Sequence, residues 1–253
     1  MEELLFLNGL LFSRLVFIFN DSHLPGRAIT LLVSVQVVLC LLLFTVGWPA
    51  MLLAVVVLLV HLATEYWPKE SWLNESRILS VVIILVATTL LREQLTLATW
   101  LNAVLAELVS FFGSAGANID GFLSPALWFL LGFLLVANEA NLLIRSLFHR
   151  FNLEPRLHAD NDGTKSPDQL DEQEYNAGRV IGILERWLMY SVLLVSQNFN
   201  VIGLIIAAKA FARFRQMEER TFAEYVLIGT LSSMLLTVLV AQIIGGLSGS
   251  WFT

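Results

Sequence analysis

Charged residues are scarce in this chain, and they are unevenly placed. Only 14% of the 253 residues are Asp, Glu, Lys or Arg, whereas a soluble domain of this size carries roughly 25%. Long stretches have no charge at all, and the charges gather between those stretches. This distribution is typical of a chain whose surface is largely solvated by a lipid bilayer. The net charge of −6 also argues against nucleic acid as a partner.

Cysteine is nearly absent. Cys40 is the single cysteine and lies inside an apolar run, so no intrachain disulfide can form and the redox compartment is not indicated. The first residues, Met1–Glu3, are acidic where a secretory signal would be basic, and no small-residue cleavage site follows them. We therefore expect the N-terminal segment to be retained.

Motifs for the common chemistries are missing as well. The sequence has no zinc, haem or nucleotide-binding pattern, no Walker-type glycine loop and no G-x-S-x-G. His61 and Glu65 lie four residues apart on one helical face, but two ligands do not make a metal site. Residues 160–163 are similar to part of a calcium loop, yet its first and twelfth positions would be His158 and Gln169. We therefore predict no enzyme activity, no cofactor and no metal site.

Long apolar runs are what the chain does have. A spanning helix needs about 20 mostly apolar residues. We predict spans near residues 28–46, 50–63, 73–91 and 122–145, a helical hairpin over 178–215 and a last span over 222–247. The segments near 4–19 and 95–112 carry polar residues, and we expect interfacial helices there, although both could also span. The predicted fold is an all-α, polytopic transmembrane helix bundle, whose C-terminal hairpin either crosses the bilayer or re-enters it.

An acidic loop divides the chain into two membrane halves. Residues 148–177 separate an N-terminal half, 1–147, from a C-terminal half, 178–253, and the polar stretch 149–174 within them is expected to be solvated. Lys and Arg accumulate on the cytoplasmic side of membranes. With 95–112 lying flat on the outer face, all basic residues except Arg92 fall on one side. This orientation predicts a cytoplasmic loop, a cytoplasmic N-terminus and a periplasmic C-terminus.

The hairpin in the second half predicts an ion pair. Its only polar break is Gln197–Asn200, which we interpret as the turn. Glu185 and Lys209 each lie about twelve residues from that turn, and at about 1.5 Å per residue both sit roughly 18 Å away from it. Arg186 and Arg213 are close competitors for the acid. Charges within a membrane usually find partners and often mark functional sites, although a purely structural neutralisation would need the same contact.

A second polar group occurs near the end of the span over 122–145. Asn138 and Asn141 share a helical face, with Glu139 beside them and Arg145 four residues further on. Glu224 suits a first-turn carboxylate that meets a helix dipole. The candidate pathway or binding residues are therefore Glu185, Arg186, Lys209, Arg213, Asn138, Glu139, Asn141, Gln197 and Glu224.

Three motifs in the second half carry a resemblance. They are G-R-x-I-G-x-L-E-R over residues 178–186, A-A-K-x-x-x-R-F over 207–214, and E-Y-x-L-I-G-T-L-x-S over 224–233. In combination they resemble the C-terminal portion of a family of uncharacterised bacterial integral membrane proteins. The resemblance implies a bacterial inner-membrane location and no known activity, and it points to the same charged residues as the helical spacing.

Two classes of function remain open from the sequence. The first is a small transporter or channel, expected to be a homo-oligomer, with the Glu185–Lys209 pair near a polar pathway. The second is a membrane-bound regulatory or effector protein that meets a cytoplasmic protein partner through 149–174. Polar residues lie within the predicted spans as well as around them, which favours the first class.

Overall fold

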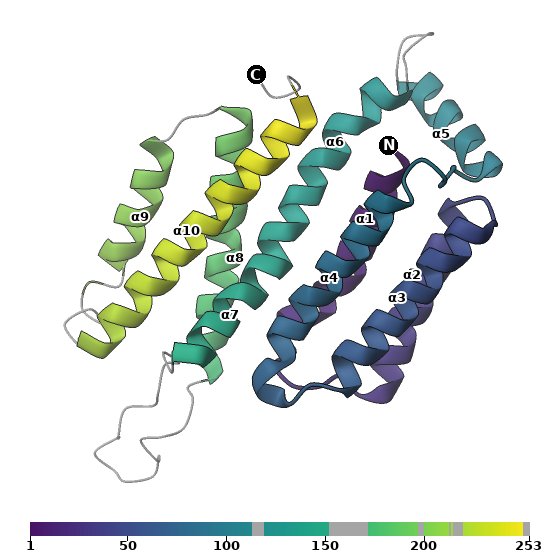
Figure 1. Cartoon of the computed structure of the whole chain (residues 1–253). Coiled ribbons are helices and arrows are strands. Elements are labelled where there is room, and N and C mark those ends of the chain that lie inside the picture. The colour runs from purple at the N-terminus through teal and green to yellow at the C-terminus, as the bar shows by residue number, and fades with distance from the viewer. Residues whose placement is uncertain (113–118, 152–171, 197–199, 213, 215–219, 250–253) are drawn as a thin grey trace.

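The computed structural model describes residues 1–112, 119–151, 172–196, 200–212, 214 and 220–249. Over these residues the chain is helical and forms no β-strand, so the all-α prediction is confirmed. The helices run side by side in two groups, with one long broken helix between them (Figure 1).

The N-terminal group contains four helices. α1 (Glu2–Ser13) continues as a 3-10 turn, η1 (Arg14–Ile18), and is followed by α2 (Gly26–Leu43), α3 (Trp48–Tyr66), the short 3-10 turn η2 (Glu70–Trp72) and α4 (Leu73–Leu90). Extended Gly47 precedes α3, and Pro49 lies in its first turn, where a backbone N–H is not needed. The Gly-Trp-Pro link therefore closes a tight α2–α3 hairpin, and α3 packs in turn on α4.

A long broken helix forms the centre of the molecule. It consists of α6 (Ile119–Leu134), a π-helical turn, η3 (Leu135–Glu139), and α7 (Ala140–Phe151). It packs against α1 and α4 on one side and against α8 and α10 on the other. Because π turns shift the backbone hydrogen-bond register, they occur often at functional positions.

The C-terminal group contains α8 (Glu172–Val195), α9 (Asn200–Ala212) and α10 (Arg220–Ser248). α10 packs closely on α8, whereas α9 lies at the edge of the bundle and contacts α8 (Figure 1). The 13 residues of α9 extend about 20 Å, short of the roughly 30 Å of bilayer hydrocarbon. The returning arm of the hairpin is thus too short for a full span. Of its predicted turn, Gln197–Asn200, residues 197–199 lie outside the described residues, and Asn200 begins α9.

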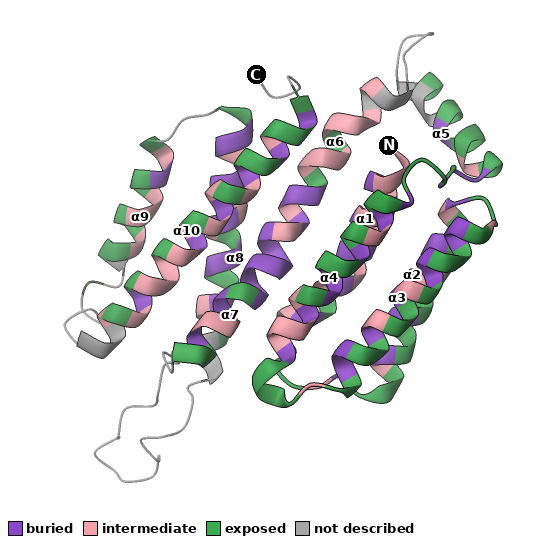
Figure 2. Ribbon diagram, viewed as in Figure 1, coloured by how far each residue is buried: buried purple, intermediate pink, exposed green. Residues whose placement is uncertain are grey.

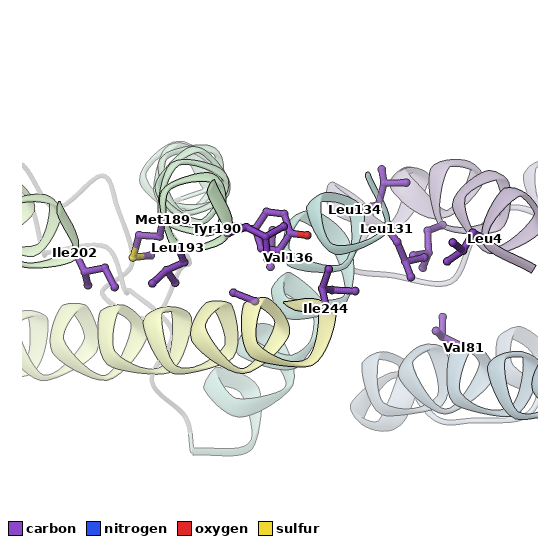
Figure 3. Packing of buried hydrophobic residues seen from close by; sticks show 13 residues of the cluster. Leu4, Val81, Leu131, Leu134, Val136, Met189, Tyr190, Leu193, Ile202 and Ile244 are labelled. Carbon is purple, nitrogen blue, oxygen red and sulfur yellow. The ribbon is translucent and has the colours of Figure 1, made fainter. Parts of the chain in front are cut away.

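One hydrophobic core joins the two groups of helices. Tyr190 of α8 is fully buried there, and its hydroxyl donates to the carbonyl of Phe129 over 3.2 Å. Figure 3 shows side chains from α1, α4, the central helix, α8, α9 and α10 in this cluster. Its labelled members are Leu4, Val81, Leu131, Leu134, Val136, Met189, Tyr190, Leu193, Ile202 and Ile244. A second core, around Leu53 and Ile84, holds the N-terminal group together.

The outside of the bundle is strongly apolar. Large hydrophobic residues along α2, α3, α4 and α10 are exposed, and Leu31, Leu59 and Leu235 each expose more than half of their surface (Figure 2). Soluble monomers rarely expose apolar patches beyond a few hundred Å². Five described helical segments are long and apolar enough to cross a bilayer, namely 26–43, 48–66, 70–90, 123–151 and 223–248. The chain is a multi-pass membrane protein by its helix composition.

Several segment boundaries differ from the sequence expectation. α8 begins at Glu172, before the predicted start of the hairpin at 178, because Glu, Gln and Ala continue the helix beyond its apolar part. Of the acidic loop 149–174, residues 152–171 lie outside the described residues. α5 (Thr99–Phe112) lies at one end of the bundle, beside the start of α6, and its predicted flat placement stays a prediction (Figure 1).

The placement of α1 differs more clearly from the sequence expectation. α1 runs alongside the other helices and contacts α2 and α6, with Phe6 and Leu10 buried. Glu3 forms an ion pair with Arg92, which follows α4, at 2.8 Å. The start of α1 therefore lies at the same end of the bundle as Arg92 and the end of α10 (Figure 1). The sequence predicted the N-terminus in the cytoplasm and Arg92 outside, with 4–19 as an interfacial helix. The structure instead places both at one end of the bundle, and the side of the membrane that this end faces stays a prediction.

Candidate functional site

The predicted ion pair between the arms of the hairpin is present. Lys209 Nζ of α9 donates to Glu185 Oε2 of α8 over 2.6 Å, and both side chains are mostly buried. Equal distances from the turn bring the two residues to the same level, as the helical rise requires. The pair connects α9 to the rest of the bundle.

Arg186, the next residue of α8, is more deeply buried. It exposes 2% of its surface and connects three elements. Its Nε donates to the carbonyl of Val136 in η3 over 2.7 Å, and its Nη1 donates to Ser233 Oγ of α10 over 3.2 Å. Its Nη2 has no hydrogen-bond partner among the described residues. Burying a guanidinium costs several kcal/mol unless other groups compensate it, so this arrangement is unusual for a purely structural residue.

A cavity of about 80 Å³ lies beside Arg186, between α7, α8, α9 and α10. Asn141 of α7 also lines it, and the buried Nδ2 of this residue has no hydrogen-bond partner in the described structure. Apolar and aromatic residues form much of the remaining wall. The lining residues are Asn141, Ile144, Arg145, Phe148, Gly178, Arg179, Ile181, Gly182, Arg186, Lys209, Tyr225, Val226, Gly229, Thr230 and Ser233.

Two further arginines of the cavity wall share one carboxylate. Arg145 of α7 and Arg179 of α8 both form ion pairs with Asp21, which lies between η1 and α2. They also donate to main-chain carbonyls near the end of η1, at 2.9 Å from Arg145 to Phe17 and 2.8 Å from Arg179 to Ile18. This cluster fastens the 17–21 segment of the first half to α7 and α8.

A separate network of buried charges lies between the N-terminal group and the central helix. Arg14 donates from Nε to Glu139 Oε1 over 2.9 Å and from Nη1 to Ser80 Oγ over 3.0 Å, and its Nη1 lies 3.4 Å from His61 Nε2. Arg77 forms a two-point contact with Glu65, at 2.6 and 3.2 Å. Each buried arginine here has a buried carboxylate partner, as buried charges require. The network holds α3, α4, η1 and η3 together.

The structure places the sequence candidates in different surroundings. Asn141, Arg186 and Lys209 line the cavity, and Glu185 pairs with Lys209. Glu139 joins the N-terminal network instead, where Asn138 donates to it over 2.8 Å. Glu224 lies exposed on α10 and is not among the residues that line the cavity. Arg213 and Gln197 lie outside the described residues.

Four important residues were not among the sequence candidates. Arg14 and Arg77 form the buried network, and Arg145 and Arg179 line the cavity. The signal for Arg14 was its position within an apolar segment, which is also typical of an interfacial helix. Arg145 follows Asn141 by four residues, and Arg179 lies in the motif over 178–186. For Arg77 the sequence offered only its place beside an apolar run.

No protein-family model matches the chain, and no curated protein or solved structure is significantly similar to it.

Proposed function

We propose that the chain is a small transporter- or channel-like membrane protein whose solute enters the cavity between α7, α8, α9 and α10. The observation that carries this proposal is a cavity lined by buried charged and amide side chains inside a bundle with an apolar exterior. Ionisable residues at membrane depth are costly, and in membrane proteins they commonly mark solute or ion pathways. Binding sites between the helices of a bundle have this mixture of apolar walls and a few polar groups.

In this proposal the ion pair Glu185–Lys209 controls the movement of α9. α9 is short and peripheral, and Lys209 is both a cavity-lining residue and the partner of Glu185. Separation of the pair would release α9 from α8 and widen access to the cavity. Movement of one packed helix against another is a common way to open or close a membrane site.

The sidedness of the protein follows from its basic residues. Arg27, Lys69 and Arg150 lie near the helix ends farthest from Arg92, and we place that end in the cytoplasm. The cavity then opens toward the cytoplasmic half of the bundle, and the start of α1 and the end of α10 face the other side. This proposed topology replaces the opposite termini that the sequence suggested.

Flux through reconstituted protein tests the proposal. Proteoliposomes are placed in isotonic potassium chloride, acetate, phosphate or glutamate, and their swelling is followed by light scattering. We expect the wild-type protein to accelerate swelling over protein-free vesicles in at least one salt, and Glu185→Gln to change that rate at least several-fold. Glu70→Gln is the matched control because Glu70 is exposed and is not among the residues that line the cavity. Equal rates for wild type and Glu185→Gln, or no flux above empty vesicles, would remove the proposal.

A further inference from the structure

We propose that the cavity beside Arg186 binds a phosphate group, held directly by the Nη2 of Arg186 and the Nδ2 of Asn141. This inference rests on the proposed function, because it names the class of ligand that the same cavity would bind. The phosphate belongs either to a free, water-soluble phosphate or to the headgroup of an anionic phospholipid.

The two donors are the first reason. Arg186 and Asn141 expose 2% and 5% of their surface, and the named nitrogen of each is buried without a partner in the described structure. They come from different helices, α8 and α7, and line the same cavity. Buried polar groups are nearly always hydrogen-bonded, and two unmatched donors that share one cavity indicate a missing acceptor.

The charge of the cavity wall is the second reason. Arg145, Arg179, Arg186 and Lys209 all line the cavity. Asp21 pairs with the first two and Glu185 with Lys209. No carboxylate of the described residues lies within ion-pair distance of Arg186. The guanidinium of Arg186 therefore keeps a positive charge that no contacting carboxylate of the described residues offsets, and an anion is the ligand that would offset it.

The shape of the donor set favours phosphate. A guanidinium presents a planar fork of donors that suits phosphate oxygens, and Asn141 adds a donor from a second direction. A single carboxylate has fewer acceptor oxygens to meet donors on different helices. The rings of Phe148 and Tyr225, with centroids 4.8 Å apart, supply an apolar wall for an organic part of the ligand.

Two glycines keep this space open. A Cβ at Gly182 would lie 3.4 Å from Arg186 Nη1, and a Cβ at Gly229 would lie 2.7 Å from Phe148 Cζ. A side chain at Gly229 would press on the aromatic wall, and one at Gly182 would come into close contact with the guanidinium. The absence of side chains at these two helical positions thus preserves the space between the donors and the aromatic wall.

Direct binding tests the inference independently of flux. The full chain, purified in detergent and stripped of lipid, is incubated with radiolabelled inorganic phosphate, and binding is measured by equilibrium dialysis. In a second arm, native mass spectrometry follows retention of phosphatidylglycerol against phosphatidylcholine. Binding in the first arm identifies a free phosphate ligand. Selective retention of phosphatidylglycerol without phosphate binding identifies a lipid headgroup.

The variants decide whether the cavity is responsible. We expect Arg186→Gln and Asn141→Leu each to weaken the observed binding, the first by at least about tenfold, since it removes a charge-assisted contact. Arg92→Gln is the matched control because it removes an exposed arginine at the other end of the bundle. If Arg186→Gln fails to fold, Asn141→Leu decides, because it removes a donor that has no partner among the residues that the structure describes.

Two outcomes would overturn the inference. One is that neither phosphate nor phosphatidylglycerol binds the wild-type protein more strongly than phosphatidylcholine does. The other is that the folded cavity variants bind as well as Arg92→Gln. Binding of phosphate or phosphatidylglycerol without any flux would retain this inference and remove the proposed function, whereas flux with neither phosphate binding nor selective retention of phosphatidylglycerol would do the reverse.

Discussion

Arg14 and Glu139 are 125 residues apart in the sequence, yet Arg14 Nε lies 2.9 Å from Glu139 Oε1 and both residues are buried. The contact joins the end of α1 to the π-helical turn of the central helix. It therefore connects the N-terminal group to the same turn whose Val136 carbonyl accepts from Arg186. The buried network and the cavity residue Arg186 are therefore connected through one short irregular segment, η3.

Removal of one member of this pair is predicted to be costly. Glu139→Leu leaves the Arg14 guanidinium buried without its acid, and we expect the free energy of unfolding to fall by about 3–5 kcal/mol. Arg14→Met combined with Glu139→Leu should recover a large part of this loss, because neither charge is then buried alone. Thermal unfolding in one detergent measures the effect. Glu3→Gln, which breaks the exposed Glu3–Arg92 pair, should cost at most about 1 kcal/mol. Equal losses for Glu139→Leu and Glu3→Gln would contradict the assignment.

Exchanging the two charges of the Glu185–Lys209 pair is predicted to preserve the contact. Glu185→Lys places two ammonium groups at the contact between α8 and α9, and we expect a loss of about 1–3 kcal/mol in stability, because both side chains are mostly buried. Glu185→Lys with Lys209→Glu restores an opposite-charge contact and should regain most of the loss. The melting temperatures of wild type, both single variants and the double variant form the test. Strictly additive losses would show that the two side chains do not interact.

The helical segments and this ion pair could be predicted from the sequence. Apolar runs with short polar breaks set the helix positions, since a bilayer admits few alternatives to helices with satisfied backbone groups. The Glu185–Lys209 contact followed from the constant rise of two antiparallel arms. The helix positions depend on local sequence alone, and the ion pair depends only on the equal distances of two residues from one turn.

The contacts between the halves could not be predicted in this way. The pairing of Arg14 with Glu139 depends on how α1 packs on α6, which no local pattern specifies. Asp21 lies in a short connection, and its contact with Arg145 and Arg179 appears only when three segments come together. The cavity depends likewise on the π turn at 135–139, because that turn places the Val136 carbonyl opposite Arg186.

The two glycines in the C-terminal group predict opposite responses to alanine. A Cβ at Gly229 would lie 2.7 Å from Phe148 Cζ, and Phe148 in turn packs on Tyr225. We expect Gly229→Ala to lower stability by about 1–3 kcal/mol through overpacking. No atom lies within 4 Å of a Cβ at Gly203 in α9, so Gly203→Ala should raise stability by about 0.5–1 kcal/mol through helix propensity. Thermal unfolding of both variants provides the test, and a stabilising Gly229→Ala would contradict the close packing of α10 on α7.

The shared end of α1, α10 and Arg92 predicts which cysteines react from one side of the membrane. In a Cys40→Ser background, we expect cysteines at Glu93 and Gly249 to react with a membrane-impermeant maleimide added outside intact cells. Glu93 follows α4 and Gly249 follows α10, and both helices end at the side of the bundle where α1 begins (Figure 1). A cysteine at exposed Lys69 lies between α3 and α4 at the other end and should react only after the membrane is opened. The asymmetric placement of Lys and Arg determines which end of the bundle faces the cytoplasm. The helix packing determines that Lys69 lies on the opposite side of the membrane from the other two positions. Labelling of all three cysteines from the same side would contradict the arrangement of α3 and α4 across the bilayer, whichever way the protein is oriented.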